Sequence, residues 1–139
     1  MQKIDLPRIS ERIRGFTLPE NGAMTVFDYD EVFLVSLQPP SVRVLDDNPY
    51  SFADLHPEHL GVSHNAPLLQ VGSTTVSYSF DPAAPSQGVR LDLDGQVQEI
   101  PFRTLSGDWF IASLSRDGSY LVIAEPYLLE VYSLSLGEA

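Results

Sequence analysis

All three histidines of this chain lie within nine residues, in a segment that also carries two carboxylates. They are His56, His59 and His64, and the carboxylates alongside them are Asp54 and Glu58. Imidazole nitrogens and carboxylate oxygens are ligands that zinc prefers. The spacing matches no paired helical or hairpin zinc signature, and Pro57 would interrupt a helix. The segment predicts a loop with locally hydrogen-bonded histidines. A metal or acid/base site and a pH-sensitive contact are the alternatives.

Clustered carboxylates form the second candidate site. Asp28, Asp30 and Glu31 lie at one predicted turn, and Asp46 and Asp47 lie at another, within the most acidic third of the chain. Glycosidic chemistry requires two carboxyl groups at a set separation across a cleft, and the sequence does not supply that separation. Aspartate is also favoured at turns because its side chain accepts backbone hydrogen bonds. We interpret both turns as partner-binding elements without a catalytic role.

Other catalytic signatures are missing from the sequence. It contains no G-x-S-x-G or S-x-x-K motif, no glycine-rich phosphate loop, no calcium loop and no cysteine. Each of these motifs places a nucleophile, a phosphate or a metal in a defined backbone setting. We therefore expect a protein without catalytic residues and without a cofactor.

The charge of the chain is strongly negative. Its 139 residues include 19 acidic and 8 basic side chains, for a formal net charge of −11. Such a field disfavours nucleic acid and anionic membranes and favours a basic protein partner, although acidity also serves solubility. No stretch reaches the roughly 20 apolar residues of a membrane span, and no signal-peptide pattern occurs. With the absence of cysteine, this pattern predicts a cytoplasmic protein.

The segment Trp109–Leu134 is predicted to form three consecutive strands that supply much of the core. Its apolar run Tyr120–Ala124 is unbroken, which indicates a strand covered on both faces. Asp117-Gly118 predicts a two-residue hairpin loop, with Arg116 facing Ser119. This register places Ala112, Leu114, Leu121 and Ile123 on one face of the sheet, and Trp109, Ile111, Tyr120 and Val122 on the other. The segment resembles one β-propeller blade without the tryptophan-aspartate dipeptide, but one chain of this length is too short for a closed propeller.

Short alternating segments predict further strands along the chain. They cover residues 24–27, 31–37, 41–45, 68–71, 74–80, 89–93 and 96–102. Asp94-Gly95 is a second hairpin signal, but a two-residue loop there sets Leu91 against Gln98, so that register stays open.

Two segments could be helical. Residues 6–15 have Pro7 at a suitable first position and Gly15 just past the end, and they predict a peripheral N-terminal helical arm over residues 1–15. A short turn of helix over residues 51–55 is the second, with Ser51 as its N-cap.

A weak repeat is visible in the strand pattern. The strands that open at Glu31, Thr75 and Ser119 are each 44 residues apart, and each is followed by a turn and a second strand. Three units of this length would suit a pseudo-threefold, trefoil-like fold, although any meander of short strands gives similar spacing.

The sequence therefore predicts one all-β domain over residues 1–139, built as an antiparallel sandwich or barrel. The function expected is that of a small acidic binding protein without enzymatic activity, such as an inhibitor or immunity-type protein that masks a basic partner. Two alternatives stay open. One is a metal-binding or hydrolytic protein that uses the histidine loop over residues 50–67, and the other is a structural subunit of a β-rich oligomer.

Overall fold

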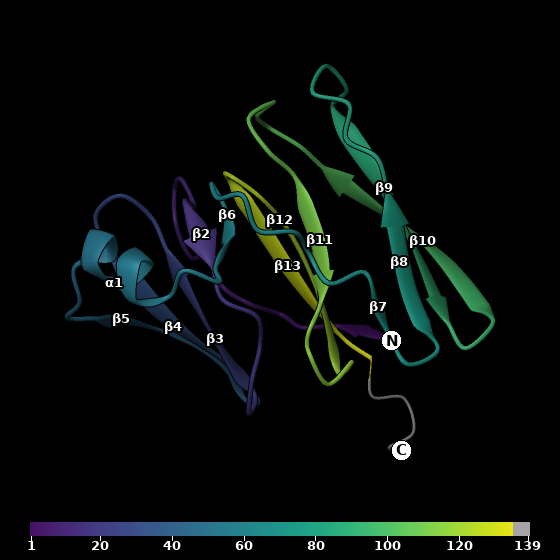
Figure 1. Cartoon of the computed structure of the whole chain (residues 1–139), viewed down its shortest axis with the longest axis horizontal. Helices are drawn as coiled ribbons and strands as arrows, with labels where there is room; N and C mark the ends of the chain where they lie inside the picture. Colours follow the sequence, from purple (N-terminus) through teal and green to yellow (C-terminus); the bar gives the residue numbers. More distant parts are fainter. Residues whose placement is uncertain (135–139) are drawn as a thin grey trace.

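The computed structural model describes residues 1–134, and its regular secondary structure is β-strand apart from one short helix (Figure 1). Its elements are β1 (Gln2–Lys3), β2 (Gly15–Phe16), β3 (Ala23–Phe27), β4 (Val32–Leu37), β5 (Pro40–Leu45), α1 (Pro49–Leu55), β6 (Leu60–Gly61), β7 (Gln70–Val71), β8 (Thr74–Tyr78), β9 (Ser86–Leu93), β10 (Gln96–Arg103), β11 (Ile111–Leu114), β12 (Tyr120–Glu125) and β13 (Leu128–Ser133).

The strands form three antiparallel sheets. The central sheet has the order β1-β13-β12-β11, the first outer sheet β5-β4-β3-β2-β6, and the second outer sheet β10-β9-β8-β7. One hydrophobic cluster joins the central sheet to the first outer sheet, and a second cluster joins its opposite face to the second outer sheet. The result is a stack of three layers (Figure 1). The all-β prediction is confirmed.

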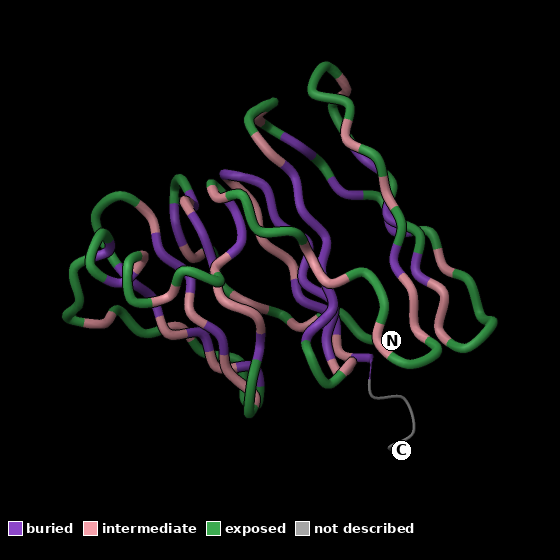
Figure 2. The backbone as a smooth tube through the Cα atoms, in the orientation of Figure 1, coloured by how far each residue is buried: buried purple, intermediate pink, exposed green. Residues whose placement is uncertain are grey.

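The central sheet is buried on both faces, as the apolar run predicted. Every residue of β12 is buried, and Figure 2 shows buried backbone concentrated in the middle layer. The predicted division of faces is also correct. Tyr120 and Val122 pack against the first outer sheet, whereas Leu121 and Ile123 pack against the second. Successive side chains of β12 point to different outer sheets, and both surroundings are apolar. A polar side chain at any position of this strand therefore needs a hydrogen-bond partner within the protein.

The hairpin between β11 and β12 has the predicted register but a different turn. Leu114 pairs with Leu121, yet the last ladder bond runs from the Ser115 N–H to the carbonyl of Tyr120. Four residues therefore form the loop, and the predicted two-residue loop is wrong. The carboxylate of Asp117 accepts hydrogen bonds from the Ser115 hydroxyl and the Ser119 N–H, which stabilises the wider turn. Those bonds lower the pKa of Asp117.

The hairpin between β9 and β10 does have a two-residue loop. Asp94 and Gly95 both have positive φ, at 52° and 95°, as this type of turn requires. Leu91 pairs with Gln98, which is the register that the sequence left open. Leu91 is completely buried against the central sheet, so burial of this face fixes the register.

The predicted helix over residues 6–15, and with it the helical arm, is wrong. Residues 4–14 contain no helix or strand, and residues 11–12 form a bend. The Ile4 N–H binds the Val131 carbonyl on β13, the Ile13 N–H binds the Pro126 carbonyl in the turn between β12 and β13, and the Arg14 N–H binds the Phe27 carbonyl on β3. Two turns of helix would have little stability of their own, whereas Ile13 in this non-helical segment is 2% exposed. At the start of the segment, β1 adds a fourth strand to the central sheet.

The helical turn expected near residues 51–55 is present as α1, with a different cap. Asn48 accepts hydrogen bonds from the N–H groups of Tyr50 and Ser51, and Pro49 occupies the first turn. Within residues 1–134, no helix has the length and apolar character that a membrane span requires.

The strands related by the 44-residue spacing lie one in each sheet. They are β4, β8 and β12, and they pair with β5, β9 and β13 respectively. The three-layer arrangement does not establish a threefold axis, so the trefoil-like form stays a prediction.

Candidate functional site

The two acidic turns meet at one end of the first outer sheet. Val32 pairs with Leu45, so Glu31 and Asp46, the next residues outward, leave the sheet at the same end. The side chains of Asp30, Glu31, Asp46 and Asp47 are exposed. The structure thus places at one end of a single sheet four of the five residues that the sequence predicts to bind a partner.

Asp28 differs from its neighbours because its carboxylate organises the turn. One oxygen accepts hydrogen bonds from the backbone N–H groups of Asp30 and Glu31, at 2.8 and 2.6 Å. The other accepts from the hydroxyl of Ser10 at 2.8 Å, which fixes the N-terminal segment to the turn. Asp28 therefore holds the backbone in place, and Asp30 and Glu31 extend from it.

Arg14 connects the two turns through aromatic rings. Its guanidinium carbon lies 5.0, 5.6 and 4.4 Å from the ring centroids of Phe27, Tyr29 and Tyr50. It also donates a hydrogen bond to the carbonyl of Pro49, in the first turn of α1. Cation–π contacts and this bond hold Tyr29 and Tyr50 in position. Both rings still face solvent, at 41% and 53% exposure.

Gly15 allows this end of the sheet to pack closely. A Cβ atom at this position would lie 2.6 Å from the Phe27 ring and 2.9 Å from the His59 ring. These rings contact each other edge to face, with centroids 5.0 Å apart. The glycine that the sequence suggested as a helix end is instead required by this close contact.

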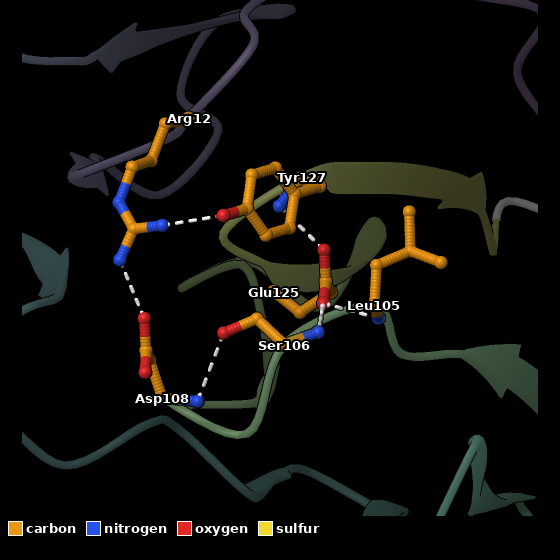
Figure 3. Close-up of polar contacts among 6 residues, drawn as sticks. All are labelled: Arg12, Leu105, Ser106, Asp108, Glu125 and Tyr127. Carbon is orange, nitrogen blue, oxygen red and sulfur yellow. Dashed lines mark hydrogen bonds and ion pairs between the residues drawn. The ribbon is translucent and has the colours of Figure 1, made fainter.

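A buried carboxylate holds the loop beside the central sheet. Glu125, the last residue of β12, has no exposed surface and accepts hydrogen bonds from the backbone N–H groups of Leu105, Ser106 and Tyr127 (Figure 3). Three donors compensate the cost of burying the charged group. The loop between β10 and β11, over residues 104–110, carries Asp108 and is thereby fixed to the central sheet.

Arg12 links the N-terminal segment, to which it belongs, with the loop that carries Asp108. Its two terminal nitrogens donate to the Tyr127 hydroxyl and to Oδ2 of Asp108 (Figure 3). Its guanidinium carbon lies 5.5 Å from the centroid of the Tyr127 ring. The bond to Asp108, followed by the interaction with Tyr127, raises the pKa of Arg12. Since the side chains of Arg12 and Asp108 are about half exposed, at 45% and 52%, the pair positions the loop more than it stabilises the fold.

Two hollows adjoin these residues and share Arg12 and Tyr29 as lining. The first, of about 480 Å³, includes Arg8, Ser10 and the acidic turn over residues 28–31. The second, of about 500 Å³, lies between Tyr29 and Trp109, and we call it the Trp109 hollow. The predicted strand that begins at Trp109 is wrong at its start, because β11 begins at Ile111. Trp109 precedes this strand and is half-buried against the first hydrophobic cluster, so its predicted place in the core is only partly met.

The three histidines have separate surroundings. His56 stacks on Phe52 and lies 3.3 Å from Glu58. His59 contacts the carbonyl of His56 through Nδ1 at 2.8 Å, and His64 lines the Trp109 hollow. Among residues 1–134, no group of three histidine, aspartate or glutamate side chains could hold a metal ion. The metal site stays a prediction that this geometry does not support.

The sequence did not single out Arg12, Arg14, Asp108 or Glu125. Both arginines were assigned to a helix that does not form. One signal for Glu125 was present: a glutamate that ends a fully apolar strand must find partners in the adjoining loops. Tyr29 could also have been noticed, as an aromatic residue inside an acidic turn.

Comparisons of this chain with protein-family models, curated proteins and solved structures gave no match.

Replacing Glu125 by glutamine should lower the free energy of unfolding by about 2–4 kcal/mol, because the amide NH₂ group would face backbone donors and the charge-assisted bonds would be lost. Urea denaturation measures the change. Glu99→Gln is the matched control, since its ion pair with Arg90 is exposed and should contribute less than about 1 kcal/mol. Equal losses in the two variants would show that the buried carboxylate has no special role.

Glu58 should give the histidine loop a pH-dependent stability. Its own backbone N–H and then His56 lower its pKa below 4.5. The stabilisation is therefore full above pH 4.5 and is lost as the pH falls through the lowered pKa. The Glu58 side chain is about half exposed, at 47%, so Glu58→Gln should cost at most about 1 kcal/mol at neutral pH. Denaturation of both proteins as the pH is lowered should show the difference shrinking below pH 4.5, and a constant difference would contradict this cause.

Proposed function

We propose that this chain is a small binding protein without enzymatic activity that masks a basic surface on a partner protein, as an inhibitor or immunity-type protein does. The observation that carries the proposal is the grouping of the two acidic turns. Asp30, Glu31, Asp46 and Asp47 are exposed at one end of a single sheet. Such a group of like charges on one surface attracts a partner of opposite sign and orients it.

Exposed tyrosines among these charges support a recognition role. Tyr29 lies inside the first acidic turn and Tyr50 follows the second, and Arg14 contacts both rings. Tyrosine and arginine are enriched among the residues that dominate binding energy at protein interfaces. Arg14 contacts both rings, and the Asn48 cap fixes the backbone of Tyr50. Less conformational entropy is therefore lost when a partner contacts these residues.

The charge of the whole chain acts in the same direction. A net charge of −11 attracts basic proteins over distances greater than direct contacts reach. This attraction increases the association rate and weakens with salt, whereas the tyrosine contacts set the dissociation rate.

Affinity capture with the immobilised protein tests the proposal. The bait should retain a basic partner from its native host at low salt and release most of it at high salt. In Asp30→Asn/Glu31→Gln/Asp46→Asn/Asp47→Asn, the association rate should fall about tenfold or more, because the local field is lost.

A matched variant separates local charge from total charge. Asp81→Asn/Asp92→Asn/Asp94→Asn/Glu99→Gln removes four charges from the second outer sheet and its loops, on the far side of the stack (Figure 1). It should retain the partner nearly as well as the unmodified chain. Equal losses in both variants would show that only net charge matters, and capture of no partner at either salt concentration would rule the proposal out.

A further inference from the structure

The Trp109 hollow combines aromatic walls with an exposed carboxylate. Tyr29 and Val62 contribute surface that is 41% and 53% exposed, and Trp109 completes the wall. Asp108 lies at the rim, with its side chain 52% exposed. A volume of about 500 Å³ is within the range of sites that take a small ligand or an inserted side chain.

The negative charge that favours a cation lies mostly in the adjoining hollow. That hollow is lined by the carboxylates of Glu11, Asp28, Asp30 and Glu31, against Arg8 and Arg12. In the Trp109 hollow the charged pair is Arg12 and Asp108, which compensate each other, and His64 also lines it. A cation that enters the Trp109 hollow would therefore lie beside the acidic turn over residues 28–31 and share Asp108 with Arg12.

This end of the molecule already binds guanidinium groups in two places. Arg14 is surrounded by three aromatic rings, and Arg12 lies over the Tyr127 ring while donating to a carboxylate. The Trp109 hollow offers the same combination of ring face and carboxylate. Arg12 uses Oδ2 of Asp108, and a carboxylate can accept further donors at its second oxygen.

We propose that the Trp109 hollow receives an arginine side chain of the basic partner. The guanidinium stacks between Trp109 and Tyr29 and donates to Oδ1 of Asp108. Arginine fits this setting better than lysine because its planar, weakly hydrated group stacks on rings and presents several donors at once. This assignment rests on the proposed function and adds one specific anchor to it.

Trp109 provides the readout, because it is the chain's single tryptophan. The probe is a capped glycine-arginine-glycine peptide, with a citrulline peptide of the same shape as the neutral control. Titration should shift the indole N–H resonance and change the fluorescence of Trp109 with the arginine peptide, and affect both much less with citrulline. Equal responses to the two peptides, or no response to arginine, would overturn the proposal without requiring any variant.

Two variants distinguish binding by Asp108 from a structural effect. Asp108→Asn should weaken binding of the arginine peptide about tenfold, the loss of roughly one charge-assisted hydrogen bond. Arg12→Gln breaks the same ion pair but leaves the carboxylate and removes a competing cation, so it should bind the peptide more tightly. If breaking the pair only loosens the loop, both variants will bind more weakly, and the assignment is wrong.

The peptide titration and the capture experiment can fail independently. A captured partner with no arginine response would retain the proposed function and remove this anchor. An arginine response without a captured partner would contradict the proposed function and leave the Trp109 hollow as an arginine-binding site.

Discussion

The structure depends on a central sheet that must be covered on both faces. The residues of β12 alternate between two hydrophobic clusters, so neither outer sheet can be removed without exposing apolar side chains. This requirement also explains why the N-terminal segment is not helical. Ile13 is buried in the first hydrophobic cluster, with Ile4, Leu6 and Ile9 packed against it, and the Ile13 N–H binds the Pro126 carbonyl in the turn between β12 and β13. A helix over residues 6–15 would have satisfied its own backbone but would have replaced this bond.

The end of the central sheet connects the core to the candidate binding surface. At Glu125 the apolar run ends in a carboxylate, which binds the backbone of the neighbouring loop. That loop presents Asp108, Asp108 binds Arg12, and Arg12 lies two residues before Arg14, which contacts Tyr29 and Tyr50. The buried Glu125 carboxylate and the half-exposed pair of Arg12 and Asp108 therefore place the exposed residues. A surface held in this way binds with a smaller loss of entropy.

Sequence periodicity is sufficient for the central strand, because the run Tyr120–Ala124 predicts both the strand and its two buried faces. Asp94-Gly95 predicts a two-residue hairpin, but the register of that hairpin follows from burial of Leu91, which the sequence leaves open. The prediction failed where side-chain hydrogen bonds determine the shape of a turn. The Asp117 carboxylate accepts hydrogen bonds from the Ser115 hydroxyl and the Ser119 N–H, and the loop has four residues instead of the two that Asp117-Gly118 predicts. Gly15 matches the residue that follows a helix in the sequence pattern. In the structure, glycine is needed there because the rings of Phe27 and His59 leave no room for a Cβ atom. For the site, sequence reasoning identified the acidic turns, but their proximity follows from the pairing of β4 with β5, and the arginine contacts depend on long-range packing.

Native-state hydrogen exchange measures most directly whether the buried carboxylate fixes the loop to the core. The amides of Leu105, Ser106 and Tyr127 donate to Glu125. They should exchange nearly as slowly as the amides of β12, although they lie outside the strands. In Glu125→Gln they should exchange much faster while the centre of β12 stays protected. Fast exchange of these three amides in the unmodified protein would contradict the account, because the surface that presents Asp108 and Arg12 would then not be held by the central sheet.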